Sequence, residues 1–103
     1  MNISVKGTKT TITPAMHELI EDKIHSLGKF LHGEHQVRVE VEVDQRHNSG
    51  DVFRVEIHVT PDDYYAEASS SDFPSALDLV VPKIREQAKK DKDKRISQRR
   101  ETP

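Results

Sequence analysis

The chain has 103 residues, a third of them apolar and a third charged, which suits one small α+β domain with a single modest core. It contains no cysteine, so disulfides, thiolate metal sites and a cysteine nucleophile are excluded. The formal net charge of −2 hides an asymmetry, because residues 83–103 carry nine basic and four acidic side chains whereas residues 1–82 carry seven and fourteen.

The N-terminal third of the chain predicts a strand followed by a helix. Residues 2–6 alternate between polar and apolar side chains, as a short strand does. Thr13 and Pro14 form a typical helix start, a hydroxyl cap followed by proline at the first helical position. Apolar residues at helical spacing then predict an amphipathic helix of about 18 residues with a C-cap at Gly33. These residues are Met16, Leu19, Ile20, Ile24, Leu27 and Leu31.

The middle of the chain predicts three further strands. Two runs of alternating residues, 37–44 and 53–60, flank the polar sequence RHNSGD and predict a hairpin with one buried and one wet face. After a second turn, a fourth strand has Tyr64, Ala66 and Ala68 on one face. The outer face of the sheet is mostly acidic, so we expect it to repel a polyanion.

The C-terminal third predicts a second helix. Ser71 or Asp72 can cap it, and its core-facing residues are Phe73, Ala76, Leu77, Val80 and Ile84. Pro82 interrupts this pattern, and because a proline inside a helix costs about 3 kcal/mol, we expect a kink or a break there. The apolar pattern stops after Ala88, so the basic end should project beyond the sheet.

The order of the predicted elements is β-α-β-β-β-α, which predicts an α+β fold with a four-stranded sheet. The sheet offers one apolar face, so both amphipathic helices should lie side by side on it. The first strand should pair in parallel with the second, by the right-handed crossover rule. We expect residues 1–96 to form the domain and residues 97–103 to form a disordered basic tail.

The second helix carries the most basic surface of the chain. Four of its side chains fall at i, i+4, i+7 and i+11, which places them in one stripe along a helix. Such a stripe suits a phosphate backbone, because docked cations release condensed counterions, although a solvated helix face is the alternative. The stripe consists of Lys83, Gln87, Lys90 and Lys94, and the flanking cations, which either reach RNA or solvate the helix, are Lys89, Lys92 and Arg95.

Other kinds of site are poorly supported by the sequence. No aromatic platform accompanies the basic stripe, so recognition of the shape and backbone of folded RNA fits better than base stacking. The six histidines lack cysteines or a convergent acidic cluster, so no metal or cofactor is expected. The serines at 69–71 have no glycine elbow, and nothing else argues for an enzyme.

No targeting or membrane segment is evident. The N-terminal sequence MNISVKGTKTTIT lacks an apolar core of signal-peptide length, and no stretch approaches the roughly 20 apolar residues of a membrane span. We therefore expect a cytoplasmic protein that binds no membrane and is a monomer when free.

Two stretches resemble one known family, the ribosome hibernation-promoting factors, also called ribosome-associated translation inhibitors. They are MNISVKGTKTTITPAMHELIEDKIHSLGKF and AEASSSDFPSALDLVVPKIREQAKKDKDK, and the resemblance covers about residues 1–95. In the first stretch it falls on Thr13 at the cap, Lys23 in mid-helix and Lys29 near the helix end. In the second, the family's strand end, cap and helix pattern falls on Ala66, Ala68, Asp72, Asp78, Lys83, Gln87, Lys90 and Lys94.

This resemblance implies a fold like that of double-stranded-RNA-binding domains and a site on the small ribosomal subunit. Members occupy the channel of tRNAs and mRNA, contact ribosomal RNA through the two helices, and so block initiation in stationary phase or under stress. That role would include Lys23 and Lys29, for which surface ion pairing with carboxylates of the same helix is the alternative.

The length of the chain resembles that of the short members of the family. Longer members add a C-terminal dimerisation domain that pairs two ribosomes. Some short members act with a small ribosome-modulation partner protein, and others keep single ribosomes idle. The sequence departs from the family pattern at Pro74, Pro82, Asp91 and Asp93, which affects the expected helix path and the distal contacts.

Three alternatives to ribosome silencing remain open at the level of sequence. A generic double-stranded-RNA-binding module would bind free duplexes about as well as ribosomes. A modulator of an alternative sigma factor, an older label attached to the family, would bind polymerase components instead. A small enzyme would need a convergent polar pocket that the sequence does not show.

Overall fold

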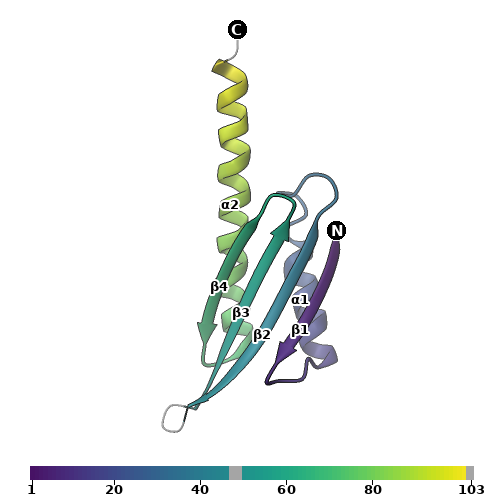
Figure 1. The fold of residues 1–103 in the computed structure, drawn as a ribbon, viewed down its shortest axis with the longest axis vertical. Helices are drawn as coiled ribbons and strands as arrows, with labels where there is room; N and C mark the ends of the chain where they lie inside the picture. Colours follow the sequence, from purple (N-terminus) through teal and green to yellow (C-terminus); the bar gives the residue numbers. More distant parts are fainter. Residues whose placement is uncertain (47–49, 102–103) are drawn as a thin grey trace.

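The computed structural model describes the backbone of residues 1–46 and 50–101, and the side chains of these residues except 46 and 94–101. Its elements are β1 (Asn2–Thr8), α1 (Pro14–His25), β2 (Gln36–Arg46), β3 (Gly50–Thr60), β4 (Tyr64–Ser70) and α2 (Phe73–Glu101) (Figure 1). The order β-α-β-β-β-α and the four-stranded sheet confirm the fold class predicted from the sequence.

The four strands form one mixed sheet in the order β1-β2-β3-β4. β1 pairs in parallel with β2, as the crossover rule predicted, and the other two pairings are antiparallel. Because side chains alternate across a strand, the odd-numbered residues of β2 and β3 point to one face, and these include most of the valines. Four of these valines are fully buried, Val37, Val41, Val55 and Val59, so the sheet has one apolar face. β1 and β4 are its edge strands.

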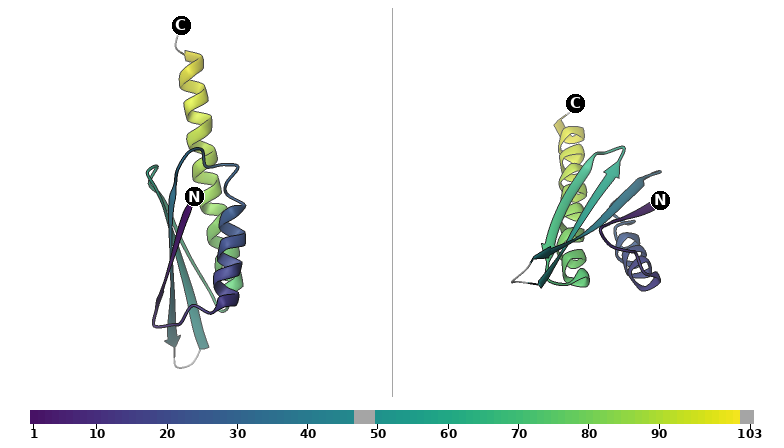
Figure 2. Two further views of the ribbon diagram at one scale, coloured as in Figure 1. Left: turned by 90° about the vertical axis from the view of Figure 1, so that its right-hand side faces the viewer. Right: turned by 60° about the horizontal axis from the view of Figure 1, so that its bottom comes forward.

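Both helices cover this apolar face, and the opposite face of the sheet is open (Figure 2). α1 contributes Ile20 and Ile24 to the shared core, and α2 contributes Leu77, Val80 and Ile84, all with no exposed surface. Burial of each such aliphatic side chain stabilises the fold by roughly 1.5–3 kcal/mol relative to exposure. The core therefore fixes each helix by its apolar stripe and leaves its other side to solvent.

α1 begins where the sequence predicted and ends earlier. The hydroxyl of Thr13 accepts a hydrogen bond from the Met16 amide at 3.2 Å, which confirms the cap. The helix ends at His25, so the predicted extension to a C-cap at Gly33 is wrong. The Ser26 hydroxyl donates to the Lys23 carbonyl at 2.5 Å, and the next amides bond three residues back rather than four. These tighter turns end the α-helix without a glycine cap.

α2 begins at an aspartate cap and runs through its proline. The Ser75 amide donates to Asp72 Oδ1 at 2.8 Å, which identifies Asp72 as the capping residue. The helix continues without interruption past Pro82, so of the two expected outcomes the break is wrong, and the kink stays a prediction. Val80 and Ile84, on either side of the proline, have no exposed surface, and their packing holds both halves in one helix. The carbonyl that the proline leaves without its helical partner belongs to the exposed Asp78, where water can solvate it.

The C-terminal half of α2 extends beyond the sheet (Figure 1). Ala88 is its last buried residue among the described side chains, and the molecule measures 61 × 26 × 17 Å along its principal axes. The backbone is helical through Glu101, whereas the sequence had predicted disorder from residue 97; residues 102–103 lie outside the described part of the chain. The boundary between domain and tail stays a prediction.

Candidate nucleic-acid interface

α2 presents the predicted basic side chains along its exposed surface. Lys83, Lys89, Lys90 and Lys92 are all exposed, whereas Gln87 is half-buried. The side chains of Lys94 and Arg95 lie outside the described residues, although both belong to the helical backbone of α2. The structure therefore places the predicted stripe and its flanking cations on one projecting helix.

The first half of the stripe lies against the edge strand β4. Here the surface is hollowed into a groove of about 420 Å³ that Tyr65, Glu67, Lys83, Gln87 and Lys90 help to line. The Lys83 ammonium donates to the Glu67 carbonyl at 3.0 Å. The Gln87 amide group accepts from the Tyr65 N–H at 3.0 Å and donates to the Tyr65 carbonyl at 2.6 Å. Two of the predicted RNA-contacting side chains are thus already bonded to the backbone of β4.

The remaining described lysines of α2 are less engaged. Lys90 lies 3.6 Å from the Glu86 carboxylate, and both side chains are largely exposed. Within the described side chains, no carboxylate comes within ion-pairing distance of Lys89 or Lys92. Exposed ion pairs such as Lys90–Glu86 contribute little and exchange readily with other partners. This surface can therefore offer its positive charge to a polyanion at small cost.

The two predicted cations of α1 have different surroundings. Lys23 lies 3.1 Å from Asp78 of α2, so it pairs across the two helices rather than with a carboxylate of its own helix. Lys29 follows the end of α1, and its ammonium lies 5.4 Å from the centre of the Phe30 ring. The sequence grouped these two lysines with the stripe, but the structure gives each of them a local partner.

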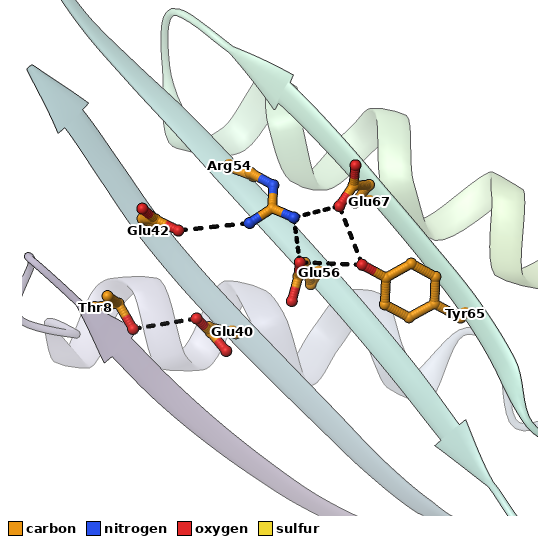
Figure 3. A network of polar contacts seen from close by, with 7 residues as sticks. All are labelled: Thr8, Glu40, Glu42, Arg54, Glu56, Tyr65 and Glu67. Carbon is orange, nitrogen blue, oxygen red and sulfur yellow. Dashed lines mark hydrogen bonds and ion pairs between the residues drawn. The ribbon is translucent and has the colours of Figure 1, made fainter.

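The open face of the sheet carries carboxylates that are gathered around one arginine (Figure 3). Arg54 of β3 binds Glu42 at 3.5 Å and makes closer ion pairs with Glu56 and Glu67. The Tyr65 hydroxyl lies 3.0 Å from the carboxylates of both Glu56 and Glu67. We name these five residues, which come from β2, β3 and β4, the Arg54 cluster.

The electrostatics of the Arg54 cluster follow from these contacts. The hydrogen bond from Arg54, and after it the one from Tyr65, lowers the pKa of Glu67. The hydrogen bond to Glu67 raises the pKa of Arg54 further above its already high value. Partial desolvation, together with the carboxylates of Glu56 and Glu67, raises the pKa of Tyr65 to about 12. The cluster therefore favours the charged forms of Arg54 and Glu67, which pair with each other.

The sequence pattern did not predict two polar contacts that have a structural role. Asp91, which looked like an interruption of the basic run, accepts a hydrogen bond at 2.7 Å from the hydroxyl of the buried Tyr64. His35 is almost completely buried, with its Nε2 2.9 Å from Asp62 and its Nδ1 3.2 Å from the Gly33 carbonyl. The spacing of four between Gln87 and Asp91 was a usable signal for the first contact, and no local pattern indicates the second.

Two further features were looked for in the described residues, a metal site and a membrane-spanning helix. Among the side chains that the structure describes, no three His, Asp or Glu residues come together in a way that could hold a metal ion. In that same part of the chain, no helix combines the length and the apolar composition needed to cross a membrane.

Comparison with known proteins gives consistent matches over most of the chain. A family model described as "Sigma 54 modulation protein / S30EA ribosomal protein" matches residues 3–96. The ribosome hibernation promoting factor of Klebsiella oxytoca is 29% identical over 94 residues, covering 91% of this chain and 96% of that protein. The ribosome hibernation promotion factor of Bacillus subtilis is 28% identical over 96 residues, but the match covers only 50% of its length.

Solved structures show the same fold. The N-terminal domain of Thermus thermophilus Protein Y superposes with a TM-score of 0.77 at 26% sequence identity, covering 87% of this chain and 98% of that domain.

Proposed function

This chain belongs to the Sigma 54 modulation protein / S30EA ribosomal protein family, and we propose that it is a ribosome hibernation factor. In this proposal it binds the small ribosomal subunit in the channel of tRNAs and mRNA and inhibits translation in stationary phase or under stress. It acts by occupying that channel, without catalysis and without a cofactor, and it works in the cytoplasm where ribosomes are found.

The observation that carries this proposal is the contrast between the two surfaces of the molecule. α2 carries exposed lysines with few carboxylate partners, whereas the open face of the sheet carries carboxylates bound to Arg54. A phosphate backbone is attracted by the first surface and repelled by the second. The helix side of the protein should therefore face ribosomal RNA, with the sheet turned away from it.

The residues proposed to contribute to RNA binding are those predicted from the sequence, with roles adjusted to the structure. Lys89, Lys90 and Lys92 fit direct phosphate contacts, because they are exposed and weakly paired. Lys94 and Arg95, which follow in the helical backbone of α2, are included because the sequence pattern predicted them. The remaining members, each with a described partner within the protein, are Lys83, Gln87, Lys23 and Lys29.

The test is co-sedimentation of the purified protein with separated ribosomal subunits at low and high salt. The wild type is compared with Lys89/Lys90/Lys92→Gln and with Lys6/Lys9/Arg38→Gln, which removes the same charge from β1, β2 and the turn after β1. We expect binding to the small subunit that weakens with salt. Loss of three phosphate contacts should lower the slope of log affinity against log salt by about three in the α2 variant alone.

Other results would support other functions. Equal losses in both variants would mean that net charge, rather than the α2 surface, drives binding. Equally strong binding to a free RNA duplex would favour a generic double-stranded-RNA-binding module. Binding to polymerase components with no binding to either subunit would favour modulation of a sigma factor. A small partner protein, added in a further arm, would show whether pairs of ribosomes form only in its presence.

A further inference from the structure

Three side chains of α2, spaced four residues apart, each bond to the edge strand β4. Lys83 donates to the Glu67 carbonyl, and Gln87 bonds to both the N–H and the carbonyl of Tyr65. Asp91 accepts from the Tyr64 hydroxyl. We name Lys83, Gln87 and Asp91 the polar ladder. They follow one line along α2, which runs antiparallel to β4.

The spacing of the ladder matches the spacing of the strand. Four residues of helix advance about 6 Å, and two residues of an antiparallel strand advance about 6.8 Å. Lys83 and Gln87 can therefore reach Glu67 and Tyr65, two residues apart, without bending either element. Neither a lysine nor a carboxylate could replace Gln87, because a lysine only donates and a carboxylate only accepts. The Gln87 amide does both, and so it bonds to Tyr65 as the backbone of a neighbouring strand would.

The ladder extends the attachment of α2 beyond its apolar contacts. Ala88 is the last buried residue of α2 among the described side chains, and Asp91 bonds to Tyr64 almost one turn further on. Lys89, Lys90 and Lys92 lie on this same stretch, around and after the end of the core contacts. Their positions therefore depend on this polar attachment as well as on the apolar packing of the preceding turns.

We propose that the polar ladder positions the basic surface of α2, and that Gln87 serves ribosome binding as a positioning residue rather than as a contact to RNA. The inference rests on the proposed function for its effect on ribosomes, but the ladder itself can be tested on the free protein. By holding α2 in place before docking, the ladder reduces the ordering cost that RNA binding would otherwise carry.

The sharpest variant is Tyr64→Phe, because Tyr64 is only 8% exposed and its hydroxyl faces Asp91. This change removes the last described rung and no cation. The matched control is Tyr65→Phe, which removes a hydroxyl from the Arg54 cluster on the open face of the sheet. Gln87→Ala tests the middle rung, with Lys90→Ala as the control for a direct phosphate contact on the same helix.

Two measurements are made on each variant, amide hydrogen exchange of the free protein and small-subunit affinity at several salt concentrations. Gln87→Ala should speed exchange of the Tyr65 amide about tenfold, since the hydrogen bond from that amide is lost together with the bond to the Tyr65 carbonyl. Tyr64→Phe should speed exchange in α2 after Ala88. Both should weaken ribosome binding about threefold to tenfold with an unchanged salt slope.

Lys90→Ala should instead leave Tyr65 exchange unchanged and lower the salt slope by about one. Unchanged exchange in Gln87→Ala would overturn the ladder. Faster exchange in the Tyr64→Phe and Gln87→Ala variants with undiminished ribosome affinity would overturn its positioning role. If the wild type itself fails to bind ribosomes, the proposed function and the positioning role both fail, while the exchange measurement still decides whether the ladder exists.

Discussion

The open face of the sheet and the surface of α2 are both densely charged, but their charges are arranged in opposite ways. In the Arg54 cluster one guanidinium holds three carboxylates, and Tyr65 adds a hydroxyl to two of them. On α2, Lys90 has one long contact to Glu86, and the neighbouring lysines have no described carboxylate at that distance. The comparison teaches that the number of charges on a surface matters less than how many of them are already paired.

The largest effect on ribosome affinity is expected when the positive charges of the α2 surface are replaced by negative ones. Lys89/Lys90/Lys92→Glu turns three attractive phosphate contacts into repulsive ones, so affinity for the small subunit should fall by at least about 100-fold. Co-sedimentation measures the loss, and circular dichroism checks that the fold is retained. The opposite change, Asp93→Lys in the same region of α2, should tighten binding; weaker binding in that variant would argue against an electrostatic interface.

A second change removes the central cation of the sheet face. Arg54→Ala leaves Glu42, Glu56 and Glu67 near one another without a guanidinium, so their repulsion should lower the midpoint of thermal unfolding. Ribosome affinity should change by less than about twofold, because in the proposed orientation this face is turned away from RNA. Arg38→Ala, a change at an exposed arginine outside the Arg54 cluster, is the control. A large loss of affinity in Arg54→Ala alone would place RNA on the sheet.

A smaller effect is expected where the two helices share a charge pair. Asp78→Asn removes the partner of Lys23 and so releases a cation on the helix side of the molecule. Since exposed pairs contribute about 0–1 kcal/mol, stability should change little, while ribosome affinity should rise by about twofold. Asp22→Asn removes the same charge from the exposed side of α1. Equal gains in both variants would show that only net charge has changed.

The smallest effect concerns the titration of Tyr65. In a Tyr64→Phe background, the tyrosinate absorbance should rise with a midpoint near the pKa of Tyr65, about 12, rather than the ordinary value of 10.0. Since the folded-state pKa is the higher one, the stabilisation is complete below pH 10 and is lost as the pH rises toward 12. Glu67→Gln should move the midpoint down. A midpoint at the ordinary value in the unaltered cluster would mean that its hydrogen bonds do not hold in solution.

The order of elements could be predicted because each one has a local signature. The alternation in β2 and β3 specifies strands with one apolar face, and Thr13 and Asp72 mark the starts of the two helices. The end of α1 could not be predicted, since it depends on the Ser26 hydroxyl and on turns that bond three residues back. The passage of α2 through Pro82 depends on core packing on both sides, which no local pattern contains.

The candidate site was predictable in its position and less so in its roles. Helical spacing alone placed Lys83, Gln87 and Lys90 on one side of α2, next to the groove that they help to line. That Lys83 and Gln87 bond to β4 follows from the packing of α2 against the sheet edge, which spacing does not show. For the same reason the sequence alone does not explain an acidic residue at position 91 within a basic run. The structure explains it, because Asp91 accepts a hydrogen bond from the Tyr64 hydroxyl.

The overhang of α2 also has a consequence for how the protein approaches its target. The helix carries the basic end of the sequence away from an acidic body along the 61 Å axis, so the molecule is a permanent electric dipole. The field of a polyanion exerts a torque on such a dipole. The protein therefore tends to rotate until the C-terminal end of α2 points toward the polyanion. At physiological ionic strength the screening length is about 8 Å. On the proposed function, this alignment takes place in the last moments of the encounter, when the tip of α2 is within about that distance of the RNA.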